Sequence, residues 1–94
     1  MRVKWLKAAV ASLIAETEYI GRDNPAAAAR VEIPIKRAVE QLSKFPALGR
    51  AGRVPGTREL VVPGTPYVLP YRVRHEAVEI LRVFHGARKW PKKF

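Results

Sequence analysis

The chain has 94 residues, of which 48% are hydrophobic, and 18 Lys and Arg against 8 Asp and Glu give a formal charge of +10. This length suits one small globular domain, so we expect residues 1–94 to form a single domain. The excess of cations favours a polyanionic partner such as nucleic acid or an acidic protein segment. Without cysteine, disulfides, thiolate metal sites and thiol nucleophiles are excluded, and two isolated histidines do not form a metal cluster, so no metal or cofactor is expected.

The N-terminal segment carries charges throughout. It contains no apolar run that approaches the roughly 20 residues of a membrane span or the core of a signal peptide. We therefore expect a cytoplasmic protein.

The first two elements predicted are a short strand and a helix. Val3 and Trp5 alternate with charged residues, which predicts a strand over 2–5 with Trp5 in the core. Apolar residues then recur at helical spacing until Gly21, which ends the helix; the stripe is Leu6, Val10, Leu13 and Ile20.

A second helix, antiparallel to the first, is predicted from Asn24 and Pro25, an N-cap residue followed by proline at the first helical position. Its apolar stripe is Ala28, Val31, Ile35, Ala38 and Leu42. Pro34 interrupts this stripe and removes one backbone hydrogen bond, so we expect a kink or a break there.

Three strands are predicted in the C-terminal half. Residues 47–57 are rich in glycine and predict a loop that exposes Arg50 and Arg53. Strands follow at about 58–62, 66–73 and 78–84, and they predict an antiparallel meander before a basic tail. The expected fold class is therefore α+β, with a short N-terminal strand, a helical hairpin and this meander.

The last hairpin has a predictable register. A four-residue turn at 74–77 pairs Val73 with Val78, Arg72 with Glu79 and Leu69 with Arg82. One face then packs on the helices and holds Tyr67, Leu69, Tyr71, Val73, Val78, Ile80 and Phe84. The opposite face holds Val68, Pro70, Arg72, Glu79, Leu81, Val83 and His85. Arg82 is the exception on the apolar face, so it must reach the sheet edge or pair with an acid such as Glu59.

Three segments carry a resemblance to a known family: the loop GRAGRVPGTREL, the strand PYVLPYRV and the ending ILRVFHGARKWP. With the order of elements, they resemble the toxins of bacterial RelE/ParE toxin-antitoxin modules over nearly the whole chain. The resemblance implies a cytoplasmic toxin in a hetero-oligomer with an antitoxin, whose disordered segment wraps the sheet and helices. The superfamily contains ribosome-dependent mRNA endonucleases of the RelE type and DNA gyrase poisons of the ParE type.

The endonuclease pattern is incomplete in this sequence. RelE-type enzymes carry lysines where Glu59 and Val61 stand here, and an arginine where Val68 stands. The remaining candidates for phosphate and proton chemistry on mRNA are Arg82, His85 and Arg88. Trp90 stands where nucleases often have a catalytic tyrosine, and an indole cannot act as a general acid.

The ParE-like pattern fits better, in GTREL, PYVLPYRV and HGARKWP. It implies inhibition of gyrase through the sheet edge and the tail without catalysis. The expected target-binding residues are Arg58, Glu59, Arg72, Arg82, His85, Arg88 and Trp90. A basic nucleic-acid-binding module without toxicity is a third hypothesis, although neither helix carries the basic stripe of a groove-reading element.

Each of these residues also has a structural interpretation. Arg72 can serve as the cross-strand partner of Glu79, and Arg58 and Glu59 can form an ion pair at the sheet edge. His85 either makes a structural hydrogen bond or contacts the target. Trp90 either packs back onto the sheet or presents a stacking surface.

Overall fold

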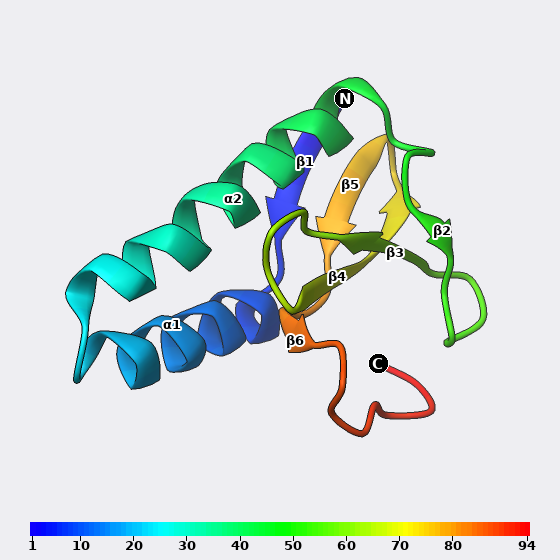
Figure 1. Ribbon diagram of the computed structural model, residues 1–94. Helices are drawn as coiled ribbons and strands as arrows, with labels where there is room; N and C mark the ends of the chain where they lie inside the picture. The colour runs from blue at the N-terminus through cyan, green and yellow to red at the C-terminus, as the bar shows by residue number, and fades with distance from the viewer.

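Two helices cover one face of a mixed sheet in the computed structural model, which describes residues 1–94 (Figure 1). The elements in chain order are β1 (Arg2–Trp5), α1 (Lys7–Gly21), α2 (Pro25–Lys44), β2 (Arg50–Ala51), β3 (Arg58–Val61), β4 (Tyr67–Arg74), β5 (Ala77–Ile80) and β6 (Phe84–His85). The α+β class and the order of the main elements are as predicted. Neither helix has the length and apolar character that crossing a membrane requires.

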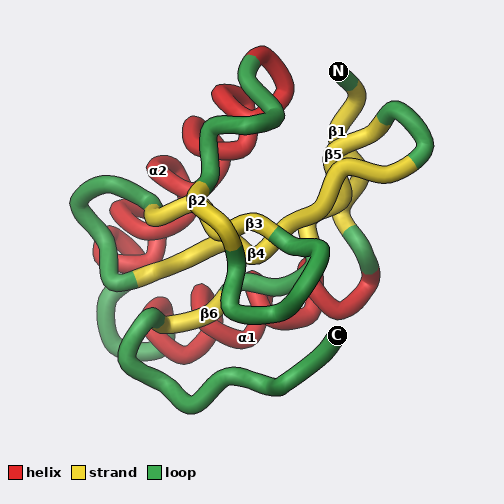
Figure 2. Tube along the Cα trace, turned by 90° about the vertical axis from the view of Figure 1, so that its right-hand side faces the viewer, coloured by secondary structure: helices red, strands yellow, loops and turns green.

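The strands lie in the order β1-β5-β4-β3-β2, and β6 pairs with the first residues of β4. The N-terminal strand joins the edge beside β5 and runs parallel to it, with Val3 opposite Val78 and Trp5 opposite Ile80. The remaining pairs are antiparallel, so the predicted meander forms the middle of the sheet. Figure 2 shows the sheet in front of the helices, with the tail running past β6.

Helix α2 begins as the sequence predicts, because the Asn24 side chain accepts a hydrogen bond from the N–H of Ala27 at 3.1 Å. Of the kink or break expected at Pro34, the break is wrong, since α2 is continuous from Pro25 to Lys44. Proline at this position removes the bond to the carbonyl of Arg30, an exposed residue, and Ile35 anchors the following turn in the core.

Helix α1 faces the core through a different stripe from the predicted one. Val10 is 41% exposed, whereas its neighbour Ala9 is fully buried and Leu13 packs against the core. Glu16 continues this stripe at the spacing i, i+4, i+7 and is also buried. The helix is thus turned by about one residue from the prediction, and a carboxylate lies on its inner face.

The core lies between the helices and the sheet. Its cluster of 12 buried residues consists of Ala9, Ile35, Ala38, Val39, Leu42, Val62, Tyr67, Leu69, Tyr71, Val78, Ile80 and Val83. Trp5 packs against this cluster, in agreement with its predicted place.

The segment predicted as a loop at 47–57 contains the edge strand β2, and Tyr71 fixes its start. The Tyr71 hydroxyl accepts from the N–H of Gly49 at 2.8 Å and donates to the carbonyl of Pro46 at 2.8 Å. A Cβ on Gly49 would lie 2.6 Å from the Tyr71 ring, so only glycine fits there. Burial raises the pKa of the Tyr71 phenol, which keeps it neutral as a donor.

The predicted third strand over 78–84 is wrong beyond Ile80. Tyr71 pairs with Ile80, but Tyr67 pairs with His85, so one extra residue lies between them. Pro70 accepts from the N–H of Leu81 at 2.9 Å but has no N–H to return, and the N–H of Val83 bonds instead to Ser12 on α1 at 2.8 Å.

This extra residue exchanges the faces of the chain that follows it. Val83 enters the core and is 1% exposed, and Phe84 turns to the face away from the helices, opposite Val68. His85 pairs with Tyr67 on the helix-facing side. Arg82 therefore does not occupy the apolar face, which removes the conflict that the predicted register contained.

The hairpin between β4 and β5 has the predicted register, including Arg72 opposite Glu79. Arg74 also pairs with Ala77, so the turn contains only His75 and Glu76. Both residues have positive φ, at 52° and 59°, which is the conformation of a two-residue type I′ turn.

Candidate functional site

Glu59 is the centre of a cluster on the face of the sheet away from the helices. Its side chain is 1% exposed and lies under two arginines, with Arg50 Nη2 at 3.2 Å and Arg53 Nε at 3.5 Å from Oε1. The backbone N–H of Arg53 also donates to Oε2 at 2.7 Å. This carboxylate therefore holds the loop after β2 in place. Both of its oxygens already have partners within the chain, so they are not available to a binding target.

Arg58 does not form the expected ion pair with Glu59. Adjacent residues of a strand point to opposite faces, and Arg58 Nη1 donates to the carbonyl of Gly49 at 2.9 Å. The interpretation of Arg58 and Glu59 as a pair is therefore wrong.

Arg72 and Glu79 form the cross-strand pair that the register predicts. Arg72 Nε donates to Glu79 Oε1 at 2.6 Å, and this hydrogen bond holds the pKa of the Glu79 carboxyl below its ordinary value. Lys4 lies opposite Glu79 on β1, and the charges of Lys4 and Arg74 add to the same effect. The carboxylate is thus ionised and surrounded by cations.

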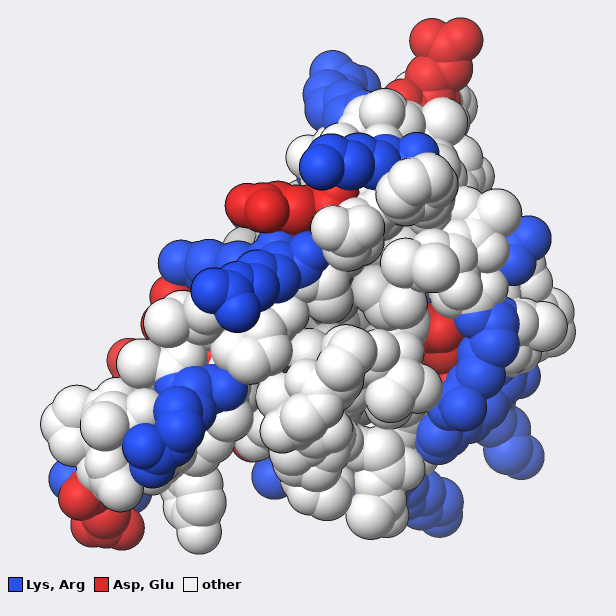
Figure 3. Space-filling view, turned by 45° about the horizontal axis from the view of Figure 1, so that its top comes forward, with Lys and Arg blue, Asp and Glu red and all other residues white.

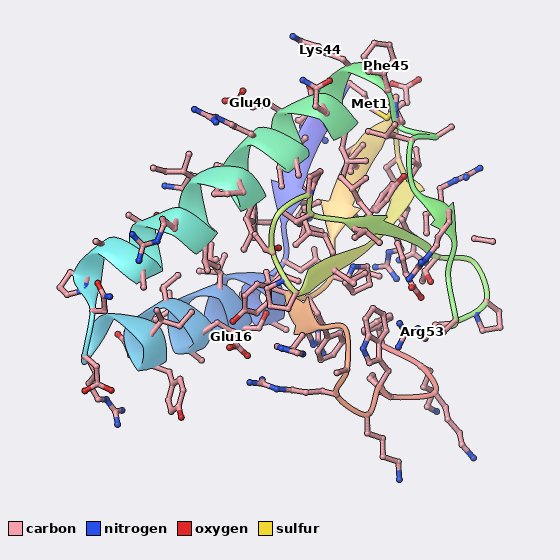
Figure 4. The ribbon with its side chains drawn as sticks, viewed as in Figure 1. Met1, Glu16, Glu40, Lys44, Phe45 and Arg53 are labelled. Atoms are coloured by element: carbon pink, nitrogen blue, oxygen red, sulfur yellow. The ribbon has the colours of Figure 1, made fainter.

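The C-terminal tail folds back onto the face away from the helices. The ring of Trp90 packs on Phe84 with centroids 4.9 Å apart, and the guanidinium of Arg53 lies 3.9 Å from the Trp90 ring. Phe94 stacks on Phe84 at 6.1 Å, and Arg82 lies 5.5 Å from the Phe94 ring. Figure 4 shows Arg53 beside the aromatic rings of this tail. Trp90 therefore packs back onto the sheet, with its indole Nε1 buried and without a partner.

A second contact ties the tail to α1. Arg88 forms an ion pair with Glu16, and the hydroxyl of Tyr67 donates to Glu16 Oε2 at 3.0 Å. Glu16 points from α1 toward β6 in Figure 4. Burial and the hydrogen bond to this carboxylate raise the pKa of Tyr67 to about 12. His85 lies edge-on to Tyr67, and its Nδ1 accepts from the N–H of Ala87 at 3.2 Å.

The predicted target-binding residues thus fall into separate places. Arg72, Arg82 and Trp90 lie on the face away from the helices, with the buried Glu59 beneath its arginines. His85 and Arg88 lie near α1, and Arg58 lies at the start of β2.

Sequence reasoning missed Glu16 and underestimated Arg53. A carboxylate at the third position of the stripe Ala9, Leu13 and Glu16 was the available signal for a buried partner of a distant cation. Nothing local indicated that Arg53 would contact both Glu59 and Trp90, because those residues approach it only in the folded chain.

Comparison with known proteins gives a consistent result. A family model described as the ParE toxin of a type II toxin-antitoxin system, parDE, matches residues 3–90. A protein named putative toxin Y4kP from Sinorhizobium fredii is 45% identical over 91 residues, which are 97% of this chain and 94% of that protein.

A second toxin and a solved structure are also similar to this chain. Toxin RelE2 of Caulobacter vibrioides is 38% identical over 87 residues, which cover 93% of this chain and 97% of that toxin. Among solved structures, a chain of the chromosomal ParDE toxin-antitoxin system from P. aeruginosa is similar with a TM-score of 0.74 and 30% identity. The similarity covers 90% of this chain and 95% of that one.

Proposed function

Because this chain belongs to the ParE toxin family of type II toxin-antitoxin systems, we propose that it inhibits bacterial growth by poisoning DNA gyrase and is neutralised by a cognate antitoxin. In this proposal residues 1–94 form one toxin domain that acts in the cytoplasm. The toxin binds its target and carries out no chemistry of its own.

The observation that carries the proposal is the separation of the residues that a nuclease of this superfamily would use. Arg88 is engaged by Glu16 near α1, whereas Arg82 lies against Phe94 on the other face. The Nδ1 atom of His85 accepts a hydrogen bond from the backbone of Ala87. General acid-base catalysis needs such groups within hydrogen-bond reach of the same reacting atoms, so this arrangement favours a binding toxin.

The helical hairpin supports the antitoxin part of the proposal. It leaves apolar side chains exposed, at 41% for Val10, 48% for Ile14 and 50% for Ile33, and Tyr19 is 70% exposed. Apolar side chains of this kind are typical anchors for a protein partner. An antitoxin segment that covers them would bury this surface in the neutralised complex.

The test compares the two candidate targets side by side. Purified gyrase with ATP and plasmid DNA receives increasing amounts of the toxin, while a second reaction contains translating ribosomes with a labelled mRNA. We expect inhibited supercoiling with linearised plasmid and an intact mRNA. Addition of the antitoxin should reverse the inhibition. Cuts at fixed positions within codons of the mRNA, together with normal supercoiling, would overturn the proposal in favour of the RelE-type endonuclease.

A further inference from the structure

The positive charge of this chain is concentrated outside the helices. Residues 7–44, which include both helices, contain six Lys or Arg and five Asp or Glu. The remaining residues, which form the sheet, its loops and the tail, contain twelve Lys or Arg and three Asp or Glu. Nine of the ten net positive charges therefore belong to the sheet and the tail. In Figure 3, blue and red side chains alternate along the left, and blue side chains gather on the right around a smaller red patch.

The strand register places many of these cations on one face. Arg2 on β1 and Arg74 on β4 flank Ala77 in one row across the sheet, and Lys4 and Arg72 flank Glu79 in the next. Residues two apart on a strand share a face, so all four cations lie on the side away from the helices. Lys93 of the tail lies beside Arg72 and Arg74. We call these five residues, Arg2, Lys4, Arg72, Arg74 and Lys93, the basic face.

The acids on this side of the sheet do not neutralise the basic face. Glu59 is buried beneath Arg50 and Arg53, and the one carboxylate in the rows, Glu79, is 7% exposed and bound to Arg72. The third acid, Glu76, lies exposed in the turn between β4 and β5 and forms no ion pair with these cations. Arg2, Lys4, Arg74 and Lys93 are exposed and form no ion pair. Their charges are therefore available to an anionic partner.

A hollow of about 360 Å³ lies within this face, between the loop at 54–57, the end of β4 and the tail. Its charged lining consists of Arg72, Arg74 and Lys93, and Thr57 adds a hydroxyl. A phosphate group is small compared with this volume, and a site with three cations and no lining carboxylate suits it electrostatically.

The aromatic side chains near this face indicate which part of a nucleic acid it would contact. Proteins that bind single strands stack bases on exposed aromatic rings. Here Trp90 lies between Arg53 and Phe84, and Phe84 also lies against Phe94. These rings contact one another and the arginines, and of the three only Phe94 lines the hollow. The face therefore offers more cations for a phosphate backbone than open ring faces for unstacked bases.

An acidic protein segment fits this face less well than DNA does. Protein partners need apolar anchors in addition to charge. On this side Leu81 is 1% exposed and Val68 is 4% exposed, and Val61 of β3 is the exposed aliphatic residue at 47%, whereas Val10, Ile14, Tyr19 and Ile33 of the helices are exposed on the other side of the sheet. A surface with many cations and few apolar anchors suits a polyanion.

We propose that the basic face binds the phosphate backbone of duplex DNA without reading its sequence. The link to gyrase rests on the proposed function: in that complex, the duplex would be the DNA that gyrase holds, and the toxin would contact DNA as well as protein. Binding to free DNA does not depend on gyrase.

The experiment measures fluorescence anisotropy of a labelled 20-base-pair duplex titrated with the intact chain at several salt concentrations. We expect affinity to fall steeply with salt, by about 0.9 in logarithmic slope for each phosphate neutralised. The variant Arg74→Glu with Lys93→Glu should bind about tenfold more weakly or worse and show a slope shallower by about two. The matched control, Arg30→Glu with Arg37→Glu on α2, changes the net charge equally and should lose much less affinity.

Three results would overturn the inference: no binding of the duplex at low salt, an equal loss in the α2 control, or tighter binding of polyglutamate or of single-stranded RNA than of the duplex. Circular dichroism verifies that both double variants are folded. The gyrase reaction run with the same variants separates the two proposals. Gyrase inhibition by a chain that binds no DNA would refute only the basic face, and DNA binding without gyrase inhibition would refute only the proposed function.

Discussion

Charged side chains are paired differently on the helical hairpin and on the face of the sheet away from the helices. On α2, Lys36 and Glu32 form an exposed pair one turn apart at 2.8 Å, so cations and acids balance locally along the helix. On the sheet, Glu59 and Glu79 are buried beneath arginines that come from other segments of the chain or from the neighbouring strand. A local pair leaves a nearly neutral surface, whereas buried acids leave the outer cations of the sheet without partners.

The largest expected effect tests which residue near position 82 faces the helices. Val83→Asp should lower the free energy of unfolding by about 4 kcal/mol or more, because it buries an unpaired carboxylate. Arg82→Ala, the control, should cost less than about 1 kcal/mol, since Arg82 lies outside the core. Urea denaturation measures both values. The reverse order of the two effects would mean that β5 continues to residue 84 in the register expected from the sequence.

A second prediction compares a buried acid of the sheet with an exposed acid of the helix. Glu59→Ala should destabilise the fold by about 2 to 3 kcal/mol, because two arginines and the N–H of Arg53 lose their acceptor. Glu32→Ala on α2 should cost about 0.3 to 0.5 kcal/mol. Thermal or urea unfolding measures the difference.

Glu59→Gln sharpens this comparison because it keeps an oxygen acceptor and removes the charge. It should fall between Glu59→Ala and the wild type. If Glu59→Ala costs no more than Glu32→Ala, the carboxylate does not hold the loop after β2.

A smaller effect is expected at the turn where the basic face ends. Glu76 has φ of 59°, which disfavours a residue with a Cβ, so Glu76→Gly should stabilise the fold by about 0.5 to 1 kcal/mol. Gly86→Ala makes the opposite exchange at a position where φ is not positive, so strain from a left-handed backbone plays no part there. The added Cβ would lie 3.4 Å from its nearest atoms. A destabilised Glu76→Gly variant in urea denaturation would contradict the type I′ turn.

The smallest change concerns pH. The pKa of Glu79 is lowered in the folded chain, so its pairing stabilises the fold above its ordinary pKa of about 4 and that contribution disappears as the pH falls through the lowered value. Arg72→Ala should move the pKa of Glu79 back up toward its ordinary value, which carboxyl chemical shifts in an NMR titration would follow. Arg30→Ala is the control and should leave this titration unchanged. If the pKa of Glu79 does not change in Arg72→Ala, Arg72 is not the main cause of the lowered pKa.

Local patterns in the sequence determined much of this protein. Asn24 and Pro25 fixed the start of α2, and the pairing of Arg72 with Glu79 followed from a short turn and alternating side chains. These features depend on neighbours within a few residues, so they can be predicted from the sequence alone. The motifs of the loop, strand and tail also predicted the toxin family, which the family model over residues 3–90 supports.

The tertiary structure alone decided where the charges and aromatic rings meet. The pair of Glu16 with Arg88 joins residues 72 positions apart, and Trp90 finds Arg53 only after the tail folds back on the sheet. The extra residue after Ile80 likewise depends on Ser12 of a distant helix, which accepts the N–H of Val83. A buried polar group must find a partner wherever the fold brings one close, and that requirement acts in space without regard to sequence separation.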